Sequence, residues 1–93
     1  MPDLFSVLFI YYACDTASQK SLLSNQVMAQ CTAAYEEVKT LFLTEDELSA
    51  MTSLSYSDRA LQMRQGYVRF KEWETQNPIL VASMKSKVVA YMY

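Results

Sequence analysis

Three groups of neighbouring carboxylates are the residues of this chain whose types and spacing could carry out chemistry. They are the pair at 36–37, the run at 45–47, and Glu72 with Glu74. Such groups can act as a general acid and base or bind a hard cation. Adjacent acids on a helix point about 100° apart, and Glu72 and Glu74 share no face either. Histidine is absent, which removes Ser-His, Cys-His and His-metal arrangements. The sequence therefore predicts no enzyme, no metal site and no cofactor.

The two cysteines, Cys14 and Cys31, are too few for a disulfide-rich scaffold and cannot complete a four-ligand zinc site. Cys31 lies on a helical apolar face, where cysteine behaves as a small apolar side chain. Cys14 is next to Asp15, whose carboxylate disfavours the thiolate that a nucleophile needs. We therefore expect both cysteines to be reduced and unreactive, and the protein to be cytoplasmic.

The composition indicates one small folded domain spanning residues 1–93. With 52% apolar and 19% charged residues, the chain has enough apolar surface to offset the entropy of ordering. It contains one glycine and two prolines, whereas β-sandwiches and barrels need many turn residues. A single glycine also excludes glycine-rich phosphate loops, and we predict no small-molecule substrate.

The most secure helix follows from an apolar stripe with steps of three and four residues. Its members are Leu23, Val27, Cys31, Ala34, Val38 and Leu41. Thr16 and Gln19 have the spacing of a capping box, so this helix is predicted to begin at Thr16 or Ser18. Nothing in residues 15–21 forbids a helix as a proline would. One continuous helix over residues 3–42 is therefore the alternative.

The second half of the chain contains stronger helix boundary signals. Thr44 and the three acids after it predict a capped helix over residues 45–52. Ser55 or Ser57 is the expected cap of a helix over 57–76, which Asn77 and Pro78 separate from a last helix. The two expected inward stripes are Tyr56, Ala60, Met63, Tyr67 and Phe70 in the first of these helices, and Val81, Met84, Val88 and Tyr91 in the second.

The most apolar stretch of the chain, residues 4–14, is predicted to be a buried core segment. It lacks the positively charged flank of a secretion signal, and eleven residues are too few to span a bilayer. Three alternatives are a membrane-surface anchor at 4–12, a processed signal, and a strand at 4–12 paired with one at 88–93. The favoured fold is an all-α bundle of four to five helices with short loops.

Charge is distributed unevenly between the two halves of the chain. Residues 1–50 contain two lysines and seven acids, whereas residues 51–93 contain six basic residues and three acids. This pattern favours an acidic helix packed against a basic one. Arg59, Arg64 and Arg69 point in different directions around their helix, so the sequence predicts no nucleic-acid surface.

Apolar surface in excess of what a small bundle can bury favours protein binding as the function. The helix over 57–76 has a second apolar set at Leu61, Val68 and Trp73, and the last helix has one at Ile79, Leu80, Val89 and Met92. Gly66 would let another backbone approach, either from this chain or from a partner. We therefore predict a protein-protein interaction module that self-associates as a homo-oligomer or binds one partner protein as an adaptor, inhibitor, immunity protein or chaperone. The alternative function is a small membrane-surface protein anchored by residues 4–12. The candidate partner-binding residues are Tyr67, Phe70, Trp73, Tyr91 and Tyr93.

Overall fold

The computed structural model describes residues 3–19 and 24–92, and each secondary-structure element in these ranges is helical. The elements are α1 (Leu4–Gln19), α2 (Asn25–Leu41), α3 (Glu45–Ala50), the 3-10 helix η1 (Met51–Ser53), α4 (Tyr56–Gln76) and α5 (Pro78–Met92). The fold is thus a small all-α bundle with five α-helices in the described part of the chain, as predicted.

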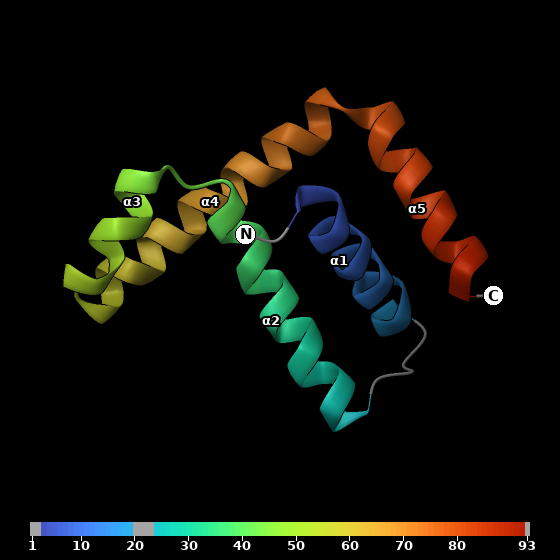
Figure 1. Cartoon of the computed structure of the whole chain (residues 1–93), viewed down its shortest axis with the longest axis horizontal. Coiled ribbons are helices and arrows are strands. Elements are labelled where there is room, and N and C mark those ends of the chain that lie inside the picture. Colours follow the sequence, from blue (N-terminus) through green and yellow to red (C-terminus); the bar gives the residue numbers. More distant parts are fainter. Residues whose placement is uncertain (1–2, 20–23, 93) are drawn as a thin grey trace.

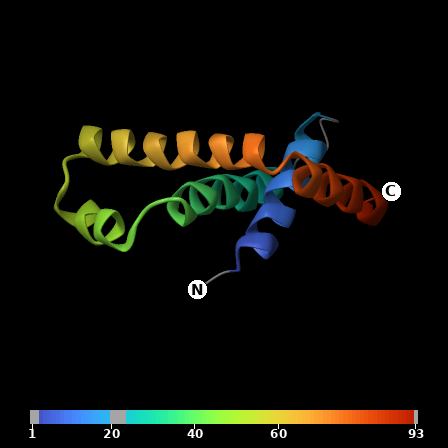
Figure 2. The same cartoon turned by 90° about the horizontal axis from the view of Figure 1, so that it is seen from above.

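Helix α1 is the centre of the arrangement. It packs against α2 on one side and against α5 on the other, while α4 packs across α2 (Figure 1). Seen from above, α3 and the first turns of α4 extend away from the other helices as an arm (Figure 2). This arm makes the molecule elongated, at 43 × 33 × 21 Å. The radius of gyration is 14.3 Å, compared with about 12 Å for a compact domain of this length.

The hydrophobic core lies where α1, α2, α4 and α5 meet. Its buried members are Val7, Leu8, Tyr12, Val38, Phe70, Val81, Met84 and Val88. Three of them belong to α1, which confirms the predicted core role for part of the apolar N-terminal segment, whereas Phe5 and Ile10 are about half exposed. The alternative of paired terminal strands is wrong, because residues 4–19 and 78–92 are helical. Within the described ranges, no helix combines the length and the apolarity needed to cross a membrane.

The predicted start of the second helix at Thr16 or Ser18 is wrong. Helix α1 continues to Gln19, and the Thr16 hydroxyl donates back to the carbonyl of Tyr12 at 2.9 Å instead of capping a new helix. Ser24 caps α2 by accepting a hydrogen bond from the amide of Val27 at 3.2 Å. Leu23, the first residue of the predicted stripe, lies outside the described residues.

The alternative of one continuous helix over residues 3–42 is also wrong. The Cα atoms of Cys14 and Cys31 are 5.6 Å apart, whereas 17 residues of straight helix would separate them by about 25 Å. The chain therefore reverses direction between α1 and α2. Cys31, Ala34 and Val38 of the predicted stripe are buried, but Leu41 is only partly buried and Val27 is exposed, so the inward face of α2 is confirmed in part.

The boundary signals in the second half of the chain are confirmed. Thr44 caps α3, and Glu47 completes the capping box by accepting a hydrogen bond from the Thr44 amide. Ser55 caps α4 by accepting from the amide of Asp58. Helix α4 ends before Asn77, whose backbone N–H donates to the Glu74 carbonyl, and α5 begins at Pro78. Each of these signals is local, so it can be recognised in the sequence.

The inward stripes of α4 and α5 are confirmed only in part. In α5, Val81, Met84 and Val88 are buried, but Tyr91 is 83% exposed. In α4, Phe70 is buried, whereas Tyr56 is 85% exposed and Ala60 is also exposed. The reason is that the first half of α4 belongs to the arm and extends past the helices that would cover it (Figure 2).

Candidate partner-binding groove

Helix α4 crosses α2 at Gly66, which is buried. A Cβ atom built on Gly66 would overlap the carbonyl oxygen of Lys39 and would lie 3.0 Å from its carbonyl carbon. The two backbones can therefore be this close only because residue 66 lacks a side chain. The backbone predicted to approach Gly66 could belong to this chain or to a partner, and in the structure it is that of Lys39 in the same chain. The crossing fixes the angle at which the first half of α4 leaves the core.

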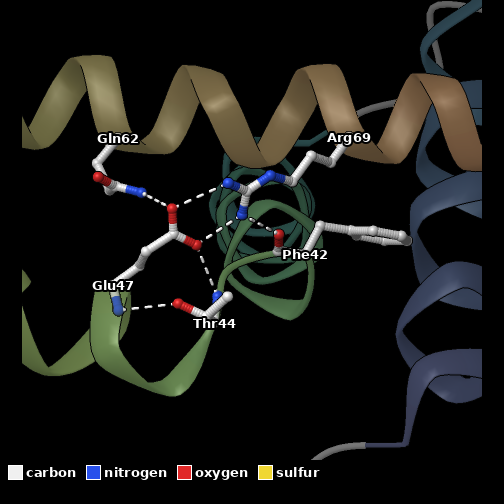
Figure 3. Close-up of polar contacts among 5 residues, drawn as sticks. All are labelled: Phe42, Thr44, Glu47, Gln62 and Arg69. Carbon is white, nitrogen blue, oxygen red and sulfur yellow. Dashed lines mark hydrogen bonds and ion pairs between the residues drawn. The ribbon is translucent and has the colours of Figure 1, made fainter.

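A second contact, a bidentate ion pair, joins α3 to α4 (Figure 3). The Nη1 and Nη2 atoms of Arg69 lie 2.6 and 2.9 Å from the two carboxylate oxygens of Glu47. Arg69 also donates to the Phe42 carbonyl at 3.0 Å, and Gln62 donates to Glu47 at 2.8 Å. The carboxylate thus receives hydrogen bonds from Arg69, Gln62 and the Thr44 amide. Arg69 above all, followed by the Thr44 amide, lowers the pKa of Glu47 far below its usual range.

Capping and the helix dipole were the only roles predicted for residues 45–47, and the pairing of Glu47 with Arg69 was not predicted. The distance of 22 residues between them carries no local signal. The attraction predicted between the acidic and basic halves of the chain is present in this pair. Although α3 and η1 have no fully buried residue, this pair and its neighbours join α3 to α4 by polar contacts.

Beside the crossing, α2, η1 and α4 line a groove of about 1260 Å³. Its walls are the C-terminal end of α2, residue Met51 of η1 and the first half of α4. The lining residues on α4 with apolar surface are Tyr56, Ala60, Leu61, Met63 and Tyr67. Four of them belong to the stripe that the sequence predicted to face inward. An apolar helical face that no part of the described chain covers is thus the main feature of the groove.

The charges that line the groove have a net positive sign. Lys39 and Glu36 form an ion pair at 3.0 Å, which leaves two arginines, Arg59 and Arg64. Both arginine side chains are exposed. Within residues 3–19 and 24–92, neither has an ion-pair or hydrogen-bond partner for its guanidinium group. The groove is therefore cationic on a chain whose formal net charge is −2.

The structure separates the five predicted partner-binding residues. Tyr67 is 41% exposed and lines the groove, and Trp73 is partly buried against Phe42, with ring centroids 6.0 Å apart. Tyr91 is on α5, where its ring contacts that of Phe9. Tyr93 lies outside the described residues.

The prediction that Phe70 binds a partner is wrong. Its side chain is fully buried, and its ring meets the Tyr11 ring edge to face at 5.1 Å. Phe70 is therefore a core residue and has no surface to offer a partner. Tyr56 and Leu61 are exposed groove residues that were not among the predicted partner-binding residues. Both are in the sequence pattern of α4, but the pattern alone assigned Tyr56 to the core.

A polar contact inside the bundle joins α1 to α4. The Tyr12 hydroxyl donates to Glu74 at 2.7 Å, and the Lys71 ammonium lies 2.7 Å from the other oxygen of the same carboxylate. The Lys85 ammonium lies 5.4 Å from the centroid of the Tyr12 ring. Burial, and then the hydrogen bond to Glu74, raise the pKa of Tyr12 well above its usual range. This phenol and this carboxylate therefore connect α1 to α4.

The two cysteines form a disulfide between α1 and α2, which corrects the expectation that both are reduced. Both residues are buried, at 7% and 3% exposure, so the bond lies inside the α1–α2 contact. Disulfides persist in oxidising compartments and are rare in the cytosol. Among the described residues, no cluster of three or more cysteine or acidic side chains could hold a metal ion.

Comparison of the chain with protein-family models, with curated proteins and with solved structures finds no match. The groove is therefore the basis for a proposed function.

Proposed function

We propose that this protein is a protein-protein interaction module that binds one partner protein in the groove between α2, η1 and α4. The observation that supports the proposal is the apolar stripe of α4 that remains outside the core. Tyr56 is 85% exposed, Leu61 is 65% exposed, and both line the same groove as Tyr67. Contiguous apolar surface of this kind on a small protein is typical of an interaction site, and tyrosine is enriched at interfaces.

The proposal restricts the predicted partner-binding residues to those that line the groove. Tyr67 stays in the set and is joined by Tyr56 and Leu61, whereas Tyr91 lies on α5, outside the groove lining. The membrane-surface alternative is not carried forward, because Val7 and Leu8 of its proposed anchor are at the centre of the core. The cytoplasmic location stays a prediction, and the disulfide weighs against it.

The test compares Tyr56, which lines the groove, with Tyr91, which has almost the same exposure but lies outside the groove. The wild-type chain is used to capture a partner from its native source, and the affinity is then measured for Tyr56→Ala, Tyr67→Ala and the control Tyr91→Ala. A groove anchor should lose about 2 kcal/mol of binding free energy, or roughly 30-fold in Kd, while the control stays close to wild type. Equal losses in all three variants, or a loss confined to Tyr91→Ala, would contradict the proposal.

Light scattering over a range of concentrations tells whether the partner is another protein or a second copy. A dimer that Tyr67→Ala converts to a monomer would place a second copy in the groove. A wild-type monomer at all concentrations would mean that the groove binds a different protein.

A further inference from the structure

The shape, the apolar stripe and the charge of the groove together specify a class of partner. We infer that the groove binds an amphipathic α-helix of the partner that has an apolar face bordered on both sides by acidic residues. This inference rests on the proposed function and adds to it the conformation and the charge of the bound segment.

The length of the apolar stripe supports a helical occupant. From Tyr56 to Tyr67 the stripe covers three turns of α4, or about 16 Å, which matches a partner helix of about eleven residues. Ala60 and Met63 continue the stripe between them, with the spacing by which helices pack. The described chain has no sheet edge to which an extended peptide could add a strand. Among the common modes of peptide recognition, a helix in an apolar groove is the one that these walls allow.

The positions of the two unpaired arginines specify the charge of the occupant. At 100° per residue, Arg59 and Arg64 lie about 70° to either side of the middle of the stripe formed by Tyr56, Ala60, Met63 and Tyr67. The stripe is thus bordered by one cation on each side. A helix docked on the stripe brings the two borders of its own apolar face to these arginines. Acidic residues at those borders would pair with both guanidinium groups, whereas basic residues would be repelled.

Other charges near the groove do not cancel this pattern. Glu36, the one acidic residue among those that line the groove, is already paired with Lys39. Asp58 lies on the opposite face of α4, about 170° from the middle of the stripe. The groove therefore keeps two cationic groups for an incoming ligand. Two arginines on opposite borders of an apolar stripe do not form the continuous basic track of a nucleic-acid surface.

The test measures binding of two designed helical peptides by fluorescence anisotropy. Both have about 14 residues with leucines at positions i, i+4, i+7 and i+11; one has glutamates along both borders of the leucine face, and the other has lysines there. The protein is used as the full oxidised chain. We expect the acidic peptide to bind at least about tenfold more tightly than the basic one at low salt, with the difference shrinking as salt is added.

Charge reversal in the protein locates the effect. Arg59→Glu and Arg64→Glu should each weaken the acidic peptide about fivefold or more. The control is Lys87→Glu, which makes the same change of charge at an exposed position of α5 outside the groove and should change the affinity less than twofold. Far-UV circular dichroism of each variant establishes that the helices are intact.

Several results would overturn the inference. The first is equal affinity for the two peptides, the second is no binding of the acidic peptide up to about 1 mM, and the third is an equal loss in the Lys87→Glu control. A homodimer that Arg64→Glu dissociates would also overturn it, because a second copy would then occupy the groove. If any of these is found while Tyr67→Ala still weakens the native complex, the proposed function stands and only the nature of the bound segment is wrong.

Discussion

Breaking the disulfide between Cys14 and Cys31 should lower the stability of the fold by an amount that follows from the loop it closes. The bond joins residues that are 17 apart in sequence. Closing a loop of this length in the unfolded chain removes entropy worth about 3 kcal/mol at 25 °C. For a domain of this size, each kcal/mol shifts Tm by roughly 4 to 8 °C. Reduction should therefore lower Tm by roughly 12 to 24 °C.

The measurement is thermal unfolding, followed by circular dichroism, of the oxidised chain, the chain with a thiol reductant, and the double variant Cys14→Ala/Cys31→Ala. The reduced chain should melt well below the oxidised one. The double variant controls for the reductant, because it should melt at the same temperature with and without it. Identical melting of the oxidised and reduced chains, or two free thiols in protein purified without reductant, would refute the reasoning. Alkylation of the thiols in intact cells would then also test the cytoplasmic prediction, since the cytosol keeps such pairs reduced.

Two further substitutions test other contacts of the fold. Gly66→Ala should destabilise the protein by about 1 to 3 kcal/mol in guanidinium unfolding, because the new Cβ overlaps the backbone of Lys39. At a helix position free of such a contact the same change would stabilise by about 1 kcal/mol, so a gain in stability would contradict the crossing. Tyr12→Phe should cost about 1.5 kcal/mol at neutral pH by removing the hydrogen bond to Glu74. Since the raised pKa of Tyr12 keeps the folded phenol neutral, its contribution is complete below pH 10 and is lost as the pH rises and the unfolded tyrosine ionises. Unfolding measured between pH 8 and about 11 should therefore show a smaller alkaline loss in the variant than in the wild type; equal losses would show that Tyr12 is not the titrating group.

Features set by neighbouring residues could be predicted from the sequence. Thr44 and Ser55 cap the helices that follow them, and Pro78 begins α5, because each of these residues acts on backbone amides within one turn. The buried positions of α2 and most of those of α5 follow from helical periodicity. Residues 4–14 are apolar on all sides, which predicts a core segment, but only Val7, Leu8, Tyr12 and Cys14 of them are buried.

Features set by residues far apart in sequence could not be predicted. The stripe of α4 has the same steps at Tyr56 as at Phe70, yet one side chain is exposed and the other is buried. Periodicity identifies residues that share a face, but the extent of a neighbouring helix decides which of them are covered. The Cys14–Cys31 bond depends in the same way on how α1 and α2 pack, and neither cysteine has a local signal that identifies its partner. The groove likewise depends on residues far apart in sequence, since its walls come from α2, η1 and α4.

The arm that includes α3 also divides the molecule into regions of different local stability. Opening of a helix costs free energy in proportion to the apolar contacts that it breaks, and α3 and η1 contribute no buried residue to the core. Their backbone amides can therefore exchange with solvent through a local opening that leaves α1 and α5 intact. Val7, Leu8 and Val88, in contrast, become accessible only when the whole core unfolds. One wall of the groove thus includes Met51 of η1, in a part of the chain that can open without unfolding the core, so the width of the groove can adjust to its ligand at little cost to the stability of the fold.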